Sequence, residues 1–212
     1  VRRHGQSAVL EWPLVDEEYF QHVDTLASVL EAWHAGAEDF GVVELGTSFL
    51  APWAAKAVAA WRRLVPNGRC RVGLAEFVDA DAAELRGALG RLGLAGCDAR
   101  VWNVDVRQSG LPELLHDFGT IDYLDMDIDG PELEVVLKSR AFLRERVRRL
   151  HIGTHARHTH YALKEALLAD GWELVWSFPS NAYVETRYGR VAFLDGVLGV
   201  VSAEAHWRRG AR

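Results

Sequence analysis

Apolar and polar positions along this chain follow two alternating patterns. Short apolar runs predict buried strands at residues 41–46, 70–75, 99–104, 121–128 and 147–152. Apolar residues three or four positions apart predict helices before, between and after these strands, at 16–33, 52–64, 81–92, 111–118, 131–143 and 160–170. This alternation favours an α/β protein with a mostly parallel sheet and helices on both faces.

The last part of the chain has a different pattern. Residues 172–178 (WELVWSF) alternate between apolar and polar side chains and predict a sixth strand. Residues 191–194 and 197–201 predict a last strand or hairpin, which would give the sheet an antiparallel end. Segment 179–189 (PSNAYVETRYG) is rich in turn residues, and we expect a loop there, near the mouth of a site.

Composition narrows the class of protein. The chain has 212 residues, 49% of them hydrophobic, and a net charge of −6. This length suits one large domain, and the acidic balance argues against a nucleic-acid-binding protein. No apolar run approaches the roughly 18 residues of a membrane span. Cys70 and Cys97 are too few for a disulfide framework or a four-cysteine zinc site, and they favour a reducing, cytoplasmic location.

Ligand-binding residues are expected where the strands end, because open α/β sheets bind ligands beyond the carboxyl ends of their strands. Glu44 and Gly46 end the first predicted strand, where the acid can meet polar ligand groups and the glycine allows close backbone approach. Glu76 ends the second, where a carboxylate can accept both hydroxyls of a ribose. Each of these residues alone could equally be a turn glycine or a solvated acid.

Asp125, Asp127 and Asp129 end the fourth predicted strand in a D-x-D-x-D-G pattern. An EF-hand loop is excluded, because the twelfth position is Val136 rather than Glu and a strand precedes the motif. Alternation places the three carboxylates on one side of an extended segment, where they raise one another's pKa unless a cation or donors lie among them. Asp129 could instead cap the helix that begins at Pro131.

Four histidines, His151, His155, His158 and His160, lie close together in the sequence. His151 ends the fifth strand and His155 follows it, so both could face the ligand crevice. His158 and His160 lie at the start of a helix and are expected to face solvent. A histidine near a carboxylate is the usual proton acceptor at neutral pH, although any of the four could be an ordinary surface residue.

Several segments together resemble the FkbM-type methyltransferases, which are S-adenosylmethionine-dependent enzymes with the seven-stranded class I fold. Segment 12–20 (WPLVDEEYF) resembles the family's lead-in helix, and 43–46 (VELG) resembles its first cofactor motif. Segment 121–132 (IDYLDMDIDGPE) resembles its acidic stretch, and 151–155 (HIGTH) its most distinctive block. Segment 193–197 (FLDGV) resembles one of its closing strands, so the resemblance covers nearly the whole chain.

The resemblance implies a Rossmann-like, seven-stranded, mostly parallel sheet with an antiparallel C-terminal end. It divides the chain into a lead-in segment and helix at 1–40 and a class I methyltransferase-like domain at 41–212. It also implies a set of cofactor-binding residues: Glu44, Gly46, Thr47, Glu76, Phe77, Asn103 and Val104. Glu44, Gly46 and Thr47 would line the methionine part of S-adenosylmethionine. Glu76 would hold the ribose hydroxyls, and Phe77, Asn103 and Val104 would border the adenine.

The implied catalytic residues are Asp127, His151 and His155. Methyl transfer is an in-line displacement, so the enzyme mainly aligns the acceptor and removes its proton. Either histidine could be the base, with Asp127 orienting it or binding a cation. The first motif departs from the family, because Gly46 is followed by TSFLAPW instead of further glycines. Phe49 and Leu50 therefore stand where backbone would otherwise approach the cofactor.

Three functions follow from these observations. The first is O-methyl transfer to a hydroxyl of a small molecule, such as a sugar or a polyketide-type natural product, with no nucleic acid or membrane as partner and with a homo-oligomer possible. The second is a binding or scaffolding protein that has kept the fold and lost the cofactor. The third is a metal-dependent enzyme using Asp125, Asp127, His151 and His155. A divalent cation beside the cofactor is left open, and we expect Val1 to mark a truncation or a numbering choice.

Overall fold

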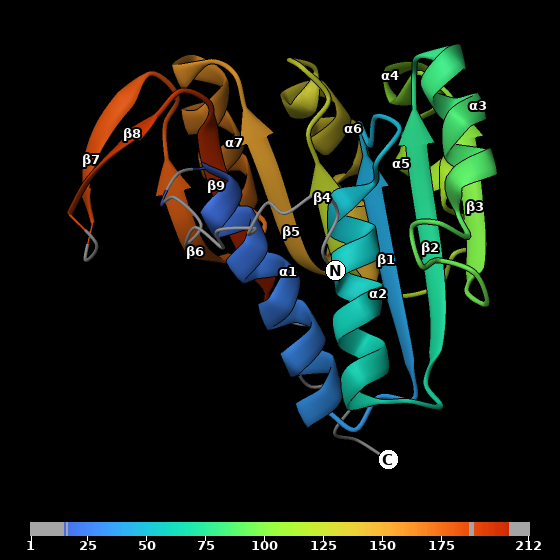
Figure 1. Cartoon of the computed structure of the whole chain (residues 1–212). Helices are drawn as coiled ribbons and strands as arrows, with labels where there is room; N and C mark the ends of the chain where they lie inside the picture. The colour runs from blue at the N-terminus through green and yellow to red at the C-terminus, as the bar shows by residue number, and fades with distance from the viewer. Residues whose placement is uncertain (1–14, 16, 187–188, 204–212) are drawn as a thin grey trace, which may run out of the picture.

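A seven-stranded sheet forms the centre of the molecule in a computed structural model that describes residues 15, 17–186 and 189–203. The strand order is β3-β2-β1-β4-β5-β9-β6 (Figure 1). These strands are β1 (Asp39–Leu45), β2 (Arg69–Glu76), β3 (Asp98–Asn103), β4 (Ile121–Met126), β5 (Val147–Thr154), β6 (Trp172–Phe178) and β9 (Gly196–Ser202). Strands β1 to β5 pair in parallel, while β9 runs antiparallel to both β5 and β6. The predicted seven-stranded, mostly parallel sheet with an antiparallel end is confirmed.

Seven helices accompany the sheet among the described residues, and they cover both of its faces. They are α1 (Glu17–His34), α2 (Pro52–Leu64), α3 (Asp79–Ala88), α4 (Val106–Ser109), α5 (Leu111–Leu114), α6 (Glu132–Arg146) and α7 (Arg157–Ala169). Helices α1 and α2 lie in front of the sheet in Figure 1, and α3 shares their apolar core. Helices α5, α6 and α7 pack on the opposite face in a second core.

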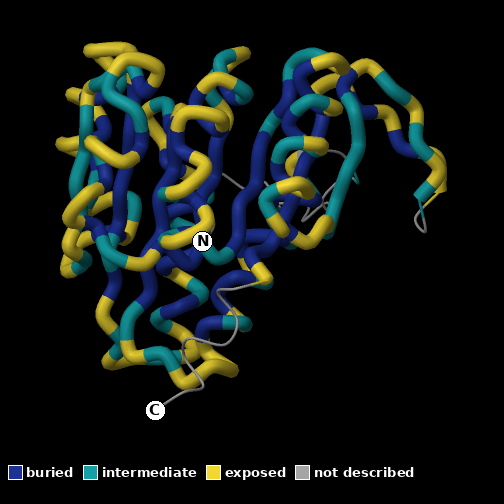
Figure 2. The backbone as a smooth tube through the Cα atoms, turned by 180° about the vertical axis from the view of Figure 1, so that it is seen from behind, coloured by how far each residue is buried: buried dark blue, intermediate teal, exposed yellow. Residues whose placement is uncertain are grey.

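The central strands are buried on both sides, as Figure 2 shows from behind. In β1, Val42, Val43 and Leu45 have no exposed surface, which explains why the strand is a continuous apolar run instead of an alternating one. In α2, Ala54, Val58 and Trp61 bury one helix face against this sheet. These buried strands hold their carboxyl ends, where the candidate site lies, in fixed positions.

The C-terminal hairpin does not join residues 191–194 to 197–201, because β9 pairs with β5 and β6 in the main sheet. The expected loop at 179–189 is wrong, because β7 (Ala182–Thr186) pairs antiparallel with β8 (Gly189–Phe193). This two-stranded sheet projects beside β6 (Figure 1). No residue of β7 is fully buried. A strand with so little buried surface carries few apolar residues, so its sequence does not show a strand pattern among the turn residues around it.

A second unpredicted feature is a disulfide between Cys70 and Cys97. Cys70 lies in β2 and Cys97 immediately before β3, with their Cα atoms 4.8 Å apart. This pairing runs against the interpretation that the two cysteines favour a reducing compartment, while the cytoplasmic location itself remains a prediction. Within the described part of the chain, no helix is both long enough and apolar enough to cross a membrane.

Candidate functional site

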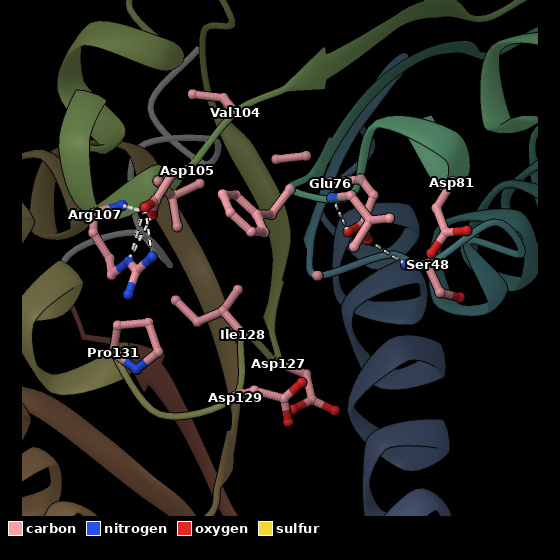
Figure 3. Close-up of a pocket in the computed structure, with 15 residues that line it drawn as sticks. Ser48, Glu76, Asp81, Val104, Asp105, Arg107, Asp127, Ile128, Asp129 and Pro131 are labelled. Carbon is pink, nitrogen blue, oxygen red and sulfur yellow. Dashed lines mark hydrogen bonds and ion pairs between the residues drawn. The ribbon is translucent and has the colours of Figure 1, made fainter. Parts of the chain in front are cut away.

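A cavity of about 440 Å³ opens at the carboxyl ends of β1, β2, β3 and β4 (Figure 3). The chain changes direction across the sheet between β1 and β4, and such a switch point is where open α/β sheets bind ligands. The lining residues come from the strand ends and the loops after them: Gly46, Ser48, Ala75, Glu76, Phe77, Val78, Asp81, Val104, Asp105, Val106, Arg107, Asp127, Ile128, Asp129 and Pro131. Of the predicted site residues, Gly46, Glu76, Phe77, Val104 and Asp127 therefore come together here.

Glu76 connects the loops that follow β1 and β2. Its Oε2 accepts a hydrogen bond from the backbone N–H of Ser48 at 2.8 Å, and its Oε1 accepts one from Val78 at 2.8 Å (Figure 3). A carboxylate has about four acceptor positions, so two protein donors leave room for two more. Glu76 can therefore hold the loop and still accept hydroxyl groups from a ligand in the cavity.

The loop after β1 keeps a glycine-like backbone with few glycines. Gly46 has φ +82°, and a Cβ at that position would lie 1.8 Å from the backbone oxygen of Asp127. Ser48 (φ 48°) and Ala51 (φ 40°) also take left-handed conformations, which favour glycine. Phe49 and Leu50 are exposed and do not line the cavity, so the backbone of Gly46 and Ser48 still reaches it.

The cavity wall near the end of β3 is partly apolar. Val104 and Phe77 line it, while Asn103 lies behind them and donates from Nδ2 to the backbone oxygens of Glu76 and Phe77 at 3.1 and 3.0 Å. Asn103 therefore supports the loop after β2 without lining the cavity.

Asp105 and Arg107 line the cavity and form an ion pair, and neither was among the predicted site residues. Their side chains meet at 2.6 Å, and Asp105 also accepts from the backbone N–H of Arg107 and so caps α4. The hydrogen bonds from Arg107 lower the pKa of Asp105 to about 2. The position of Asp105 at the end of β3 is the signal that could have found it.

Glu44 and Thr47 lie beneath the cavity and do not line it. Glu44 is buried, and its Oε2 accepts from the backbone N–H of Ala54 at 2.7 Å near the start of α2. Thr47 is also buried and donates from Oγ1 to the oxygen of Ser48. Burial, followed by the nearby charge of Asp125, raises the pKa of Glu44 well above its ordinary value. Both residues shape the loop from below.

Asp125 lies apart from the two aspartates that follow it. It is buried and accepts at Oδ1 from Gln21 Nε2 at 2.7 Å and from the Tyr123 hydroxyl at 3.0 Å. Burial raises the pKa of Asp125 to about 6. The expectation that Asp125, Asp127 and Asp129 share one side is therefore met only by the last two, which line the cavity.

Asp127, Glu132 and His155 form a cluster beside the cavity. Nε2 of His155 lies 3.3 Å from Oδ1 of Asp127, and its Nδ1 lies 3.3 Å from Oε1 of Glu132. These contacts, first with Asp127 and then with Glu132, raise the pKa of His155 to about 10. The imidazole is then protonated at neutral pH, which argues against the prediction that His155 is the base in this state. Glu132 was missed because it looked like an ordinary first-turn acid of α6.

His151 is buried away from the cavity. Its Nδ1 lies 2.8 Å from Oδ2 of Asp24, a fully buried residue of α1. The prediction that His151 faces the acceptor therefore does not fit the geometry, because its ring joins α1 to β5 inside the protein. Asp24 was not proposed from the sequence, and no local signal there distinguishes it from a surface acid.

Two further expectations near the site are wrong. His160 is buried instead of solvated, and its ring nitrogens meet Oγ1 of Thr154 at 3.0 Å and the Ser177 hydroxyl at 3.1 Å. Asp129 does not cap α6, whose N-cap residue is Pro131 and which has no side-chain cap. The Asp129 backbone takes φ 56°, and its carboxylate lies 3.3 Å from Nε2 of His155 instead.

Comparisons with known proteins agree on the fold. A 78-residue stretch is 36% identical to a protein of Jannaschia sp. (strain CCS1) that carries a provisional methyltransferase name. That stretch spans 37% of this chain and 28% of the relative. No family model matches the chain.

Solved structures extend the likeness to most of the chain. The precorrin-6y C5,15-methyltransferase of Geobacter metallireducens GS-15 has a TM-score of 0.55 at 14% identity and covers 86% of this chain and 87% of its own. An rRNA methylase from Streptococcus thermophilus has a TM-score of 0.57 at 10% identity and covers 92% of this chain and 99% of its own. The chain therefore has the Rossmann-like class I methyltransferase fold.

Proposed function

We propose that the protein is an S-adenosylmethionine-dependent O-methyltransferase that acts on a hydroxyl of a small molecule, such as a sugar or a polyketide-type natural product. The observation that carries this proposal is the joint position of Gly46, Glu76 and Asp127 around one cavity at the switch point of the sheet. The fold likeness and the FkbM-type motifs support the same chemistry.

The residues around the cavity fit this cofactor. A volume of about 440 Å³ is within the range of small-molecule sites. Glu76 offers acceptor positions for the two ribose hydroxyls, and the side chains of Phe77 and Val104 offer an apolar surface for the adenine. Gly46 brings backbone close to the bound molecule because it has no side chain. When bound, S-adenosylmethionine supplies a methyl group on a positively charged sulfur.

Asp127 is the group best placed to take the acceptor's proton. Its carboxylate lines the cavity and is 49% exposed, while His155 stands behind it at 3.3 Å. Nε2 of His155 contacts Oδ1 of Asp127 and so orients its side chain toward the cavity. A hydroxyl that approaches the cavity past Asp127 can therefore pass its proton to this carboxylate as the methyl arrives.

Calorimetric titration with S-adenosylmethionine tests cofactor binding. We expect one binding site per chain and a loss of affinity of roughly tenfold or more in Glu76→Ala, which removes the ribose acceptors. Glu134→Ala is the matched control, because Glu134 is exposed on α6, pairs with Lys138 and does not itself line the cavity. No binding by the folded wild-type protein would favour the scaffolding function instead.

Transfer of a labelled methyl group to a panel of small molecules that offer hydroxyl, nitrogen or carbon acceptors tests the reaction. We expect Asp127→Asn to reduce turnover by roughly a hundredfold or more while leaving cofactor binding nearly intact, because general base catalysis contributes about that factor. Labelled nitrogen or carbon acceptors, with hydroxyl compounds unlabelled, would overturn O-methylation while leaving methyl transfer in place.

A further inference from the structure

The cluster of Asp127, Glu132 and His155 gathers side chains from three separate segments. Asp127 follows β4, Glu132 is the first residue of α6, and His155 follows β5. One oxygen of each carboxylate and one ring nitrogen all lie within 4.8 Å of one another. The folded chain therefore brings two anionic oxygens and one imidazole nitrogen to a common point at the carboxyl edge of the sheet.

Glu132 gives this cluster an unsatisfied acceptor. Its side chain has 0% exposure, and its Oε1 accepts from the backbone N–H of Gly130 at 2.9 Å and lies 3.3 Å from His155. Its Oε2 is also buried and has no hydrogen-bond partner among the described residues. A buried carboxylate oxygen without a partner is costly, because it has given up its hydration and gained nothing in return.

A proton on His155 does not remove this cost. Nδ1 of His155 lies 3.3 Å from Oε1 of Glu132 without forming a hydrogen bond, and Nε2 lies 3.3 Å from Oδ1 of Asp127. Oε2 stays unpaired in that state. A cation between the carboxylates would instead bind oxygen lone pairs directly and take the place of the proton on one ring nitrogen.

The surroundings are shaped to bring the carboxylate of Asp127 toward β5. Gly153 of β5 stands opposite it, and a Cβ on Gly153 would lie 2.8 Å from Oδ1 of Asp127. The absence of a side chain at this position lets the carboxylate reach His155. The side chains of Asp127 and His155 are 49% and 26% exposed, so an ion can reach the cluster from solvent.

We propose that Asp127, Glu132 and His155 bind one divalent cation of the Mn²⁺ type. Two carboxylates and one imidazole suit Mn²⁺, which accepts both oxygen and nitrogen ligands, while a site that binds Zn²⁺ tightly has more nitrogen or sulfur ligands. Because Asp127 also lines the cavity, a cation held by it would lie beside the space where an acceptor hydroxyl would bind. That last role rests on the proposed function, but the cation site does not.

The experiment is a titration of the purified, metal-stripped protein with Mn²⁺ alone, followed by the electron paramagnetic resonance signal of free Mn²⁺. We expect one Mn²⁺ bound per chain. Glu132→Gln and Asp127→Asn should each weaken binding by roughly tenfold or more, since each removes a charged ligand. Glu134→Gln on the same helix is the matched control and should leave binding unchanged, because its carboxylate pairs with Lys138 in solvent.

Gly153→Ala tests the geometry without removing a ligand. The added methyl group would push the Asp127 carboxylate away from His155, so Gly153→Ala should weaken Mn²⁺ binding. The Mn²⁺ affinity of the Glu134→Gln control should equal that of the wild type. Failure to bind Mn²⁺ at millimolar concentration, or binding that is equal in wild type and in folded Glu132→Gln and Asp127→Asn, would overturn the cation site. Because neither S-adenosylmethionine nor an acceptor is present, that result would leave the methyltransferase proposal standing.

Discussion

Asp24 of α1 and His151 of β5 meet inside the protein, with Oδ2 of the first 2.8 Å from Nδ1 of the second. Oδ1 of Asp24 accepts from Arg149 at 2.5 Å and from the Trp176 indole N–H at 3.0 Å. One buried carboxylate thus ties the first helix to β5 and β6. Gly199 of β9 makes this possible, because a Cβ there would lie 2.6 Å from Oδ2 of Asp24.

Replacement of Asp24 should destabilise the whole fold. In Asp24→Ala, the buried Arg149 and His151 both lose this carboxylate, and Arg149 keeps only Glu31 at the surface; breaking a buried ion pair costs about 3–5 kcal/mol. Urea unfolding measures this loss. Glu31→Ala is the control, because Glu31 bonds the same Arg149 from a position that is 38% exposed, where an ion pair is worth about 1 kcal/mol or less. Equal losses in both variants would show that Asp24 has no special structural role.

This network explains why sequence position misled the assignment of His151. His151 was predicted to end a strand, but β5 continues to Thr154 and His151 lies inside it, whereas Glu76 does end β2 and lines the cavity. The direction of the ring, however, is set by Asp24, which is 127 residues away in the sequence. A contact of that separation leaves no pattern in local hydrophobicity, so the same rule correctly placed Glu76 and misplaced His151.

Gly46→Ala should damage both the fold and cofactor binding. The methyl group would overlap the backbone oxygen of Asp127, and the φ of +82° is unfavourable for alanine. We expect a loss in the free energy of unfolding of about 2 kcal/mol or more and a lower affinity for S-adenosylmethionine. Gly87→Ala in α3 is the matched control, since a Cβ there meets nothing within 4 Å. It should stabilise by up to about 1 kcal/mol, because alanine favours a helix. Similar losses in both variants would contradict the argument.

Ser48→Gly should stabilise the protein. Ser48 takes φ 48°, a conformation that costs residues with a side chain about 1 kcal/mol or more relative to glycine. Glycine removes this cost and keeps the backbone N–H that bonds Glu76. Thermal unfolding measures the gain. Ser48→Ala retains the unfavourable φ and should show no such gain, so equal stabilisation by both variants would locate the effect in the hydroxyl group instead.

The loop around Ser48 also marks the limit of the family resemblance. From the sequence, the missing glycines predicted that Phe49 and Leu50 would stand where backbone approaches the cofactor. In the folded chain Ser48 and Ala51 adopt the glycine-like angles themselves, and the two large side chains turn outward. Sequence pattern identified the strand ends, because burial on both faces makes them continuous apolar runs. Sequence pattern could not predict the left-handed backbone angles of Ser48 and Ala51, because the surrounding fold imposes them on residues that do not favour them.

Reduction of the Cys70–Cys97 disulfide should lower stability. The bridge closes a loop that contains Glu76 and the whole of α3, and both sulfurs lie near the guanidinium of Arg62. Closing a loop with a sequence separation of 27 residues lowers the entropy of the unfolded chain, which stabilises the folded protein by about 3.5 kcal/mol. Urea unfolding with and without reductant measures the difference. In the double variant Cys70→Ser/Cys97→Ser, the reductant should have no effect; an equal effect there would disprove the role of the bridge.

His160 should make the protein less stable in mild acid. Burial, with a smaller contribution from the charge of Lys164, lowers the pKa of His160 from 6.5 to about 4. Between these values the unfolded chain binds a proton that the folded chain does not, so the free energy of unfolding falls as the pH falls from 6.5 toward 4. The limiting slope is about 1.4 kcal/mol per pH unit.

Urea unfolding at a series of pH values measures this slope. In His160→Gln the amide can still bond Thr154 and Ser177 but does not titrate, so the slope over this window should become shallower by about one proton. His158→Gln is the control, because His158 is exposed on the same helix. A slope that is unchanged in His160→Gln, or reduced equally in both variants, would mean that other groups account for the acid sensitivity.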